Sequence, residues 1–92
     1  MDLRGKNVLV TGGSRGLGRA LGEEAARRGA RVVLVARGHE ALDQVVRGIR
    51  GGGGEAHAFA ADVADKEATY RIAGAAAALV GPIDVLLHAA SA

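Results

Sequence analysis

Three runs of apolar residues along the chain have no polar interruption: Val8–Val10, Val32–Val35 and Val85–Leu87. A strand with one face in water alternates apolar and polar residues, whereas a continuous apolar run is typical of a strand buried on both faces. The runs predict three buried strands, over residues 7–11, 31–36 and 83–89. A weaker strand is predicted over residues 56–60, where Phe59 is the only large side chain.

Between these strands, apolar residues recur every three or four positions, which is the period of a helix with one buried face. Helices are predicted over residues 17–28, 40–50 and 66–80. The predicted inner faces are Leu17, Leu21 and Ala25 in the first helix, Leu42, Val45, Val46 and Ile49 in the second, and Ala68, Ile72, Ala76 and Leu79 in the third. The four glycines Gly51–Gly54 are expected to form a flexible link.

Strands and helices therefore alternate along the chain, beginning and ending with a strand. Right-handed crossovers turn this order into a parallel sheet with helices on both faces. The predicted fold class is α/β, a Rossmann-type three-layer parallel sheet with strand order 3-2-1-4 that is truncated after the fourth strand. In such a sheet, ligands bind beyond the carboxyl ends of strands one and four, where the strand order reverses.

A glycine-rich turn, Thr11–Gly18, joins the first predicted strand to the first predicted helix. Backbone N–H groups and the positive end of the helix dipole meet there, which favours a bound phosphate group. Gly12 is expected to allow the sharp turn, Gly16 to leave room for a diphosphate, and Gly18 to let helix and strand lie close together. The alternative is a glycine-rich turn that binds nothing, and the flanking strand and helix favour the phosphate site.

The glycines follow the spacing T-G-x-x-x-G-x-G rather than the commoner G-x-G-x-x-G. This pattern resembles the short-chain dehydrogenase/reductase family, and the resemblance covers nearly the whole chain. It implies an oxidoreductase that moves hydride between a nicotinamide cofactor and a small-molecule carbonyl or alcohol substrate. It also implies that residues 1–92 are the amino-terminal part of a dinucleotide-binding domain, and that the complete protein is a homo-oligomer.

The end of the second predicted strand indicates which nicotinamide cofactor is bound. NAD-binding proteins carry an acidic residue there for the ribose 2′-hydroxyl, and here Arg37 follows the strand instead. Arg15 in the glycine turn can reach the same place, and Ser14 is a further donor. Two guanidinium groups suit the 2′-phosphate of NADP, so NADP (NADPH) is the predicted cofactor. The alternative is that both arginines are solvated surface charges.

The family resemblance also assigns the remaining cofactor contacts. Gly12, Gly16 and Leu17 would hold the diphosphate, and Asp62 and Val63 would face the adenine. Ala89 and Ala90 would lie on the adenosine side. For Asp62, capping a turn is the alternative to the adenine contact, and the residue can do both.

The chain departs from the family pattern at the end of the fourth predicted strand. The family has Asn-Asn-Ala-Gly there, and this chain has His88-Ala89-Ala90-Ser91. A catalytic role is one interpretation of His88; a strand-end histidine bonded to a backbone carbonyl is the favoured one.

No catalytic residue is predicted within the chain. The family uses a Ser and a Tyr-x-x-x-Lys set, but the single tyrosine, Tyr70, is followed four residues later by Gly74. The catalytic residues are expected beyond Ala92. The alternative is a non-catalytic nucleotide-binding or scaffolding module that retains only the phosphate loop. A methyltransferase-like fold is disfavoured, because it would need an acidic residue for a ribose after the second strand, where this chain has Arg37.

Composition narrows the remaining possibilities. The formal net charge is +2 and the arginines are interleaved with acids, so nucleic acid binding is not expected. There is no cysteine, no convincing ligand spacing for a metal, and no apolar run that could span a bilayer. The polar start lacks the apolar stretch of a signal peptide, and a cytoplasmic location is expected.

Overall fold

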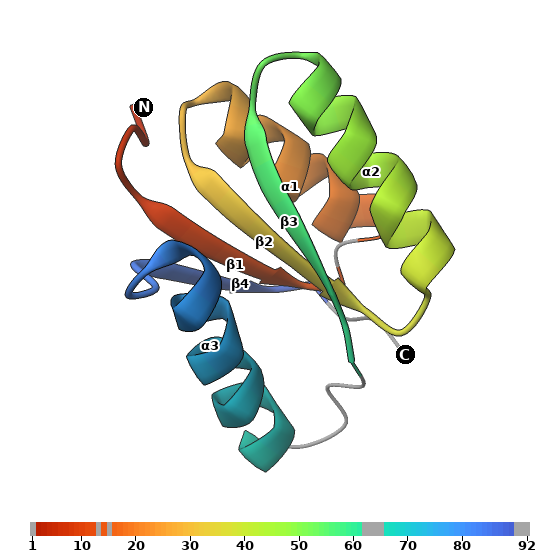
Figure 1. The fold of residues 1–92 in the computed structure, drawn as a ribbon, viewed down its shortest axis with the longest axis vertical. Helices are drawn as coiled ribbons and strands as arrows, with labels where there is room; N and C mark the ends of the chain where they lie inside the picture. Colours follow the sequence, from red (N-terminus) through yellow and green to blue (C-terminus); the bar gives the residue numbers. More distant parts are fainter. Residues whose placement is uncertain (1, 13, 15, 62–65, 90–92) are drawn as a thin grey trace.

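The computed structural model describes residues 2–12, 14, 16–61 and 66–89. Strands and helices alternate through these residues, as the apolar pattern predicts (Figure 1). The elements are β1 (Asn7–Thr11), α1 (Gly16–Arg27), β2 (Arg31–Ala36), α2 (His39–Gly51), β3 (Glu55–Ala60), α3 (Lys66–Val80) and β4 (Val85–His88).

The four strands form one parallel sheet with the order β3-β2-β1-β4. The predicted fold class and strand order are therefore confirmed. Val8 of β1 pairs with Val32 of β2 and with Val85 of β4, and this register continues to the strand ends. Since all strands point the same way, their carboxyl ends gather at a single edge of the sheet.

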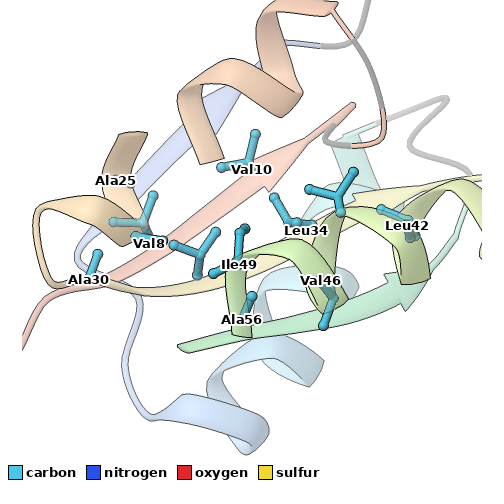
Figure 2. Close-up of a cluster of buried hydrophobic side chains, with 12 residues drawn as sticks. Val8, Val10, Ala25, Ala30, Leu34, Leu42, Val46, Ile49 and Ala56 are labelled. Atoms are coloured by element: carbon cyan, nitrogen blue, oxygen red, sulfur yellow. The ribbon is translucent and has the colours of Figure 1, made fainter. Parts of the chain in front are cut away.

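Successive residues of β1 and β2 enter two different cores, which explains their uninterrupted apolar runs. Val8, Val10 and Leu34 face α1 and α2, with Leu42 and Ile49 among their neighbours in the larger cluster (Figure 2). The smaller cluster on the other face comprises Leu9, Val33, Val35, Ile72, Ala76 and Val80. Figure 1 shows the same three layers, with α3 alone on its side of the sheet.

The predicted inner face of α1 is wrong at its start, because Leu17 is 68% exposed. The buried residues of α1 are Gly18, Gly22, Ala25 and Ala26, so the predicted Ala25 is buried, while the predicted Leu21 is half-buried. This helix lies very close to the sheet: a Cβ at Gly22 would come within 2.6 Å of Leu34 Cδ2. Only small residues fit such an approach, so the large side chain turns outward.

The fourth strand also differs from its prediction as a strand buried on both faces. Residues of β4 alternate between half-buried and exposed, and Leu86 is 47% exposed. Val85 and Leu87 pack against the cluster under α1, whereas Leu86 points to the other face. On that face α3 packs mainly over β1 and β2. The inner face predicted for α3 is wrong at its end, because Leu79 is 49% exposed and Val80 is buried instead.

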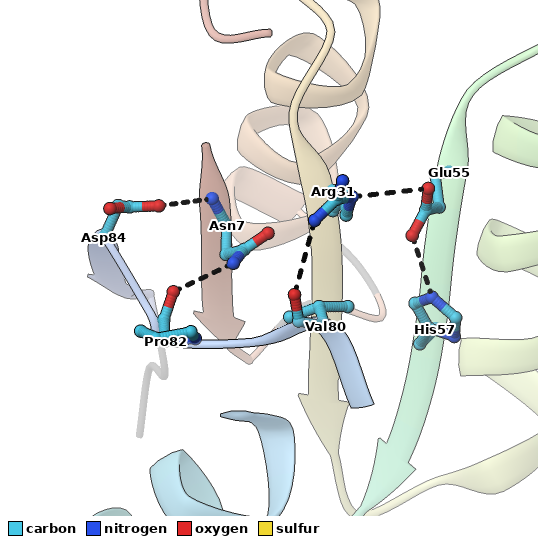
Figure 3. Close-up of polar contacts among 7 residues, drawn as sticks. All are labelled: Asn7, Arg31, Glu55, His57, Val80, Pro82 and Asp84. Carbon is cyan, nitrogen blue, oxygen red and sulfur yellow. Dashed lines mark hydrogen bonds and ion pairs between the residues drawn. The ribbon is translucent and has the colours of Figure 1, made fainter. Parts of the chain in front are cut away.

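Polar contacts fix the amino edge of the sheet (Figure 3). The backbone N–H of Asn7 donates to the Asp84 carboxylate at 2.8 Å, and Asn7 Nδ2 donates to the Pro82 carbonyl at 2.9 Å. Arg31 lies 3.7 Å from Glu55 and donates to the Val80 carbonyl at the end of α3. These contacts join the amino ends of β1, β2 and β3 to one another and to the segment between α3 and β4.

No helix in the described part of the chain has both the length and the apolar character needed to cross a membrane.

Candidate functional site

The glycine turn is anchored to three strands at the carboxyl edge of the sheet. It begins directly at the end of β1, and the N–H of Gly12 donates to the Val35 carbonyl of β2 at 2.7 Å. The N–H of Ala89, just after β4, donates to the Thr11 carbonyl at 3.0 Å. The turn therefore lies at the reversal point of the strand order, where the sequence places the ligand.

Gly18 has no room for a side chain. A Cβ at Gly18 would lie 2.0 Å from the Gly12 carbonyl oxygen and 3.2 Å from the Ala89 Cβ. The close approach of helix and strand that the sequence predicts for Gly18 is thus present. Any side chain there would push α1 away from the turn and displace its first amide groups.

Gly16 begins α1 and has the opposite surroundings. Its φ of +60° lies in the left-handed region, and apart from its chain neighbours and the backbone of α1 itself, no atom of the described residues lies within 4 Å of the place where a Cβ would be. Gly12 also has a positive φ, of +75°. Among the described residues, the start of α1 therefore leaves space beside Gly16 that suits a diphosphate; contact with a diphosphate stays a prediction.

The ends of β1 and β4 are joined by a side-chain hydrogen bond. Thr11 Oγ1 lies 2.6 Å from His88 Nδ1, and these two residues are partners in the strand register. Thr11 is fully buried, so His88 supplies the partner that its hydroxyl needs. The predicted backbone-carbonyl partner of His88 is therefore wrong, because the parallel register brings a hydroxyl to its ring instead.

The predicted selectivity residues are only partly visible. Arg37 is exposed on the connection between β2 and α2, and Ser14 in the glycine turn is half-buried. Ala89 is half-buried beside Gly18. The remaining predicted contacts, Arg15, Asp62, Val63 and Ala90, lie outside the described residues.

The contacts that sequence reasoning missed depend on tertiary pairing. The Val35 carbonyl that holds Gly12, and the Thr11 hydroxyl that meets His88, each come from a strand distant in sequence. Aligning the ends of the predicted strands would have brought Thr11 and His88 together. The pair formed by His39 Nδ1 and Asp43 Oδ2, at 2.8 Å, has a local signal in the spacing of four residues on one helix.

Among the described residues of this edge, the structure places no serine, tyrosine and lysine together in the way that the family's catalytic residues require. Tyr70, the residue type that the family uses as acid and base, is 76% exposed on α3, which covers the opposite face from α1. Within the described ranges, no cluster of three His, Asp or Glu residues could hold a metal ion. Binding of a phosphate-bearing ligand at this edge stays a prediction.

The family model described as short chain dehydrogenase matches residues 6–92. The chain belongs to the short-chain dehydrogenase family. Human short-chain dehydrogenase/reductase 3 is 44% identical over 91 residues, which cover 98% of this chain and 30% of that protein.

Solved structures of this family superpose closely on the short-chain dehydrogenase chain. A dehydrogenase/reductase from Sinorhizobium meliloti 1021 gives a TM-score of 0.92 at 37% identity, over 98% of this chain and 36% of that one. A metagenomic short-chain oxidoreductase in complex with NADP gives 0.83 at 43% identity, over 91% of this chain and 38% of that one. The chain thus spans about a third of the length of the relatives it matches.

Family membership gives the glycine turn a general role. Proteins of this family use nicotinamide cofactors, so a dinucleotide is the ligand that the turn implies. Three glycines of the turn fit a dinucleotide. Gly12 makes the turn, Gly16 leaves open space, and Gly18 permits close packing of α1.

Proposed function

We propose that this chain is the cofactor-binding portion of an NADP(H)-dependent short-chain oxidoreductase. When bound, the nicotinamide cofactor would supply or accept the hydride that passes to or from a carbonyl/alcohol substrate. The observation that carries the proposal is the glycine turn at the carboxyl edge, with open space at Gly16 and the exposed Arg37 on the adjoining connection.

Each predicted contact has a defined part in holding the cofactor. The diphosphate would lie against Gly12, Gly16 and Leu17, and Gly18 would keep α1 close enough to present its first amide groups. The 2′-phosphate would be held by Ser14, Arg15 and Arg37, the adenine by Asp62 and Val63, and the adenosine side by Ala89 and Ala90. The chain's own work is to bind and orient the cofactor.

The choice of NADP over NAD rests on charge at the end of β2. An acidic residue there would accept a hydrogen bond from the ribose 2′-hydroxyl and repel a 2′-phosphate. Here β2 ends at Ala36 and is followed by an exposed arginine, Arg37. A relative that is 43% identical was solved in complex with NADP, which supports the same assignment.

The catalytic half of the proposed enzyme would lie outside these 92 residues. Because the relatives are about three times longer, we place the Ser and Tyr-x-x-x-Lys residues in a segment that follows residue 92. The carbonyl/alcohol substrate, homo-oligomerisation and a cytoplasmic location are proposals that follow from the family resemblance and the sequence.

A second candidate is a non-catalytic nucleotide-binding or scaffolding module. It is favoured by the replacement of the family's Asn-Asn-Ala-Gly with His88-Ala89-Ala90-Ser91 at the edge of the site. The two candidates differ in the rest of the gene: a downstream Ser and Tyr-x-x-x-Lys would support the enzyme, and a natural stop after Ala92 would support the module.

Binding of NADPH and NADH, measured by the fluorescence of the reduced nicotinamide, tests the proposal. Charge-assisted hydrogen bonds contribute about 1.5–3 kcal/mol each, so NADPH should bind roughly tenfold more tightly or better. Arg37→Asp should reverse this preference, whereas Arg71→Asp, the same charge change on exposed α3, should leave it unaltered. Equal affinities for both cofactors before and after the Arg37 change would defeat the NADP assignment.

A further inference from the structure

We infer that His39, the first residue of α2, is a further contact of the cofactor's 2′-phosphate and makes that contact only when its imidazole is protonated. Affinity for the phosphorylated cofactor would then depend on pH, while affinity for the unphosphorylated one would not. This inference rests on the proposed function, because it assigns a further residue and a regulation to the same phosphate subsite.

The helical position of His39 places it at the carboxyl edge. The buried residues Leu42, Val46 and Ile49 follow it by three, seven and ten positions, so His39 lies on the stripe of α2 that faces the sheet. This stripe passes the end of β2 before it reaches His39, whose side chain is 72% exposed as a result. His39 therefore extends the inner face of α2 over the edge where the cofactor is proposed to bind.

The chain path keeps His39 near the other phosphate contacts. The glycine turn touches β2 at Val35, through the 2.7 Å bond from the Gly12 N–H. Arg37 comes two residues after Val35, and His39 two residues after Arg37. Each two-residue step spans at most about 7 Å, so the Cα atoms of Val35 and His39 lie no more than about 14 Å apart.

Asp43 determines which atom of His39 can meet a phosphate. His39 Nδ1 lies 2.8 Å from Asp43 Oδ2, and an ionised carboxylate only accepts hydrogen bonds, so Nδ1 carries a hydrogen. In the neutral ring the remaining nitrogen, Nε2, is then an acceptor and repels phosphate oxygens. In the protonated ring Nε2 becomes a donor, so binding a phosphate there takes up a proton.

The charges around the imidazole come from two elements. On α2, the Asp43 carboxylate faces the ring, and Glu40 is exposed in the same helical turn. On the connection from β2, the positive charge of Arg37 is exposed two residues before His39. Arg15 lies outside the described residues. A bound phosphate dianion between Arg37 and His39 adds the negative charge that favours the imidazolium.

Adenosine 2′,5′-bisphosphate and adenosine 5′-monophosphate are suitable probes, because they differ only by the 2′-phosphate. Calorimetric titrations from pH 6 to pH 8 would compare the wild-type chain, His39→Gln and the control His57→Gln, whose histidine lies on β3. At pH 6, His39→Gln should weaken the bisphosphate about two- to fivefold, the range of an exposed charge pair, and the difference should be smaller at pH 8. The monophosphate should bind all three proteins alike.

Proton NMR of the imidazoles gives a second measurement that a purely structural role would not affect. Adding the bisphosphate at pH 7 should shift the His39 ring resonance toward its protonated position, and the monophosphate should not. If the wild type prefers the bisphosphate but His39→Gln matches it at every pH and the resonance stays fixed, the inference is wrong and the proposed function stands. If the wild type shows no preference for the bisphosphate, the proposed NADP selectivity fails and this inference fails with it.

Discussion

The Thr11 hydroxyl and the His88 ring meet at 2.6 Å and close the carboxyl ends of β1 and β4. The N–H of Ala89, the residue after His88, donates to the Thr11 carbonyl, so both the backbone and the side chain of Thr11 form hydrogen bonds to this segment. Since Gly12 follows Thr11 directly, this closure determines where the glycine turn begins. The two residues differ in exposure: Thr11 is fully buried, whereas His88 is exposed.

That asymmetry predicts unequal costs for removing either partner. Thr11→Val deletes the hydroxyl and leaves His88 able to bond water, so the free energy of unfolding should fall by about 1 kcal/mol. His88→Ala leaves a buried hydroxyl without its partner, and the loss should be larger, about 1–3 kcal/mol. Urea unfolding of the two variants, with Thr11→Ser as the control that keeps the hydroxyl, measures both values. A smaller loss for His88→Ala than for Thr11→Val would contradict this account.

Replacing Gly18 by alanine should distort the site strongly. The new Cβ would lie 2.0 Å from the Gly12 carbonyl oxygen, and backbone must move to relieve the contact. We expect a fall of several kcal/mol in the free energy of unfolding together with loss of dinucleotide binding, measured by thermal unfolding and titration. Gly48→Ala in α2 is the matched control: its Cβ meets nothing within 4 Å, so it should stabilise the helix by about 0.5–1 kcal/mol.

Gly16→Ala separates the cost to folding from the cost to binding. The left-handed conformation costs an alanine about 1–2 kcal/mol, and here the added methyl would stand in the open space that we assign to the diphosphate. Gly53→Ala carries a similar penalty at φ +91°, also with no atom within 4 Å, but lies after α2 at the other edge. Both variants should lose similar stability in chemical denaturation, and only Gly16→Ala should weaken dinucleotide binding. Equal binding by the two variants would place the phosphate elsewhere.

The sequence predicted the sheet well because its signal is simple. An uninterrupted apolar run such as Val8–Val10 is buried only if a hydrophobic core covers each face of the sheet. The two clusters of buried residues in the structure are these cores. Element bounds differ from the prediction by at most two residues, as where the fourth strand begins at Val85 instead of Ile83. The same rule failed for β4, because burial of an edge strand depends on which helices reach it.

Contacts at the site were less predictable because they depend on distances between backbones. Helical periodicity predicted that Leu17 is a core residue. The periodicity does not reveal that α1 packs so close to the sheet that a single added methyl group, as at Gly22, would clash with Leu34. The spacing of the glycines did predict the close packing at Gly18, because only glycine permits it. The bond between Thr11 and His88 joins residues 77 positions apart and follows from the strand register.

The outward position of Leu17 gives a direct test of the altered helix face. Leu17→Ala removes a side chain that is 68% exposed, so the free energy of unfolding should change by less than about 0.5 kcal/mol. Leu42→Ala removes a fully buried side chain from α2 and should cost about 2–5 kcal/mol. Because Leu17 borders the proposed diphosphate site, its variant should weaken dinucleotide binding while folding is retained. If Leu17→Ala instead destabilised the chain as strongly as Leu42→Ala, the periodic pattern would have placed the inner face of α1 correctly.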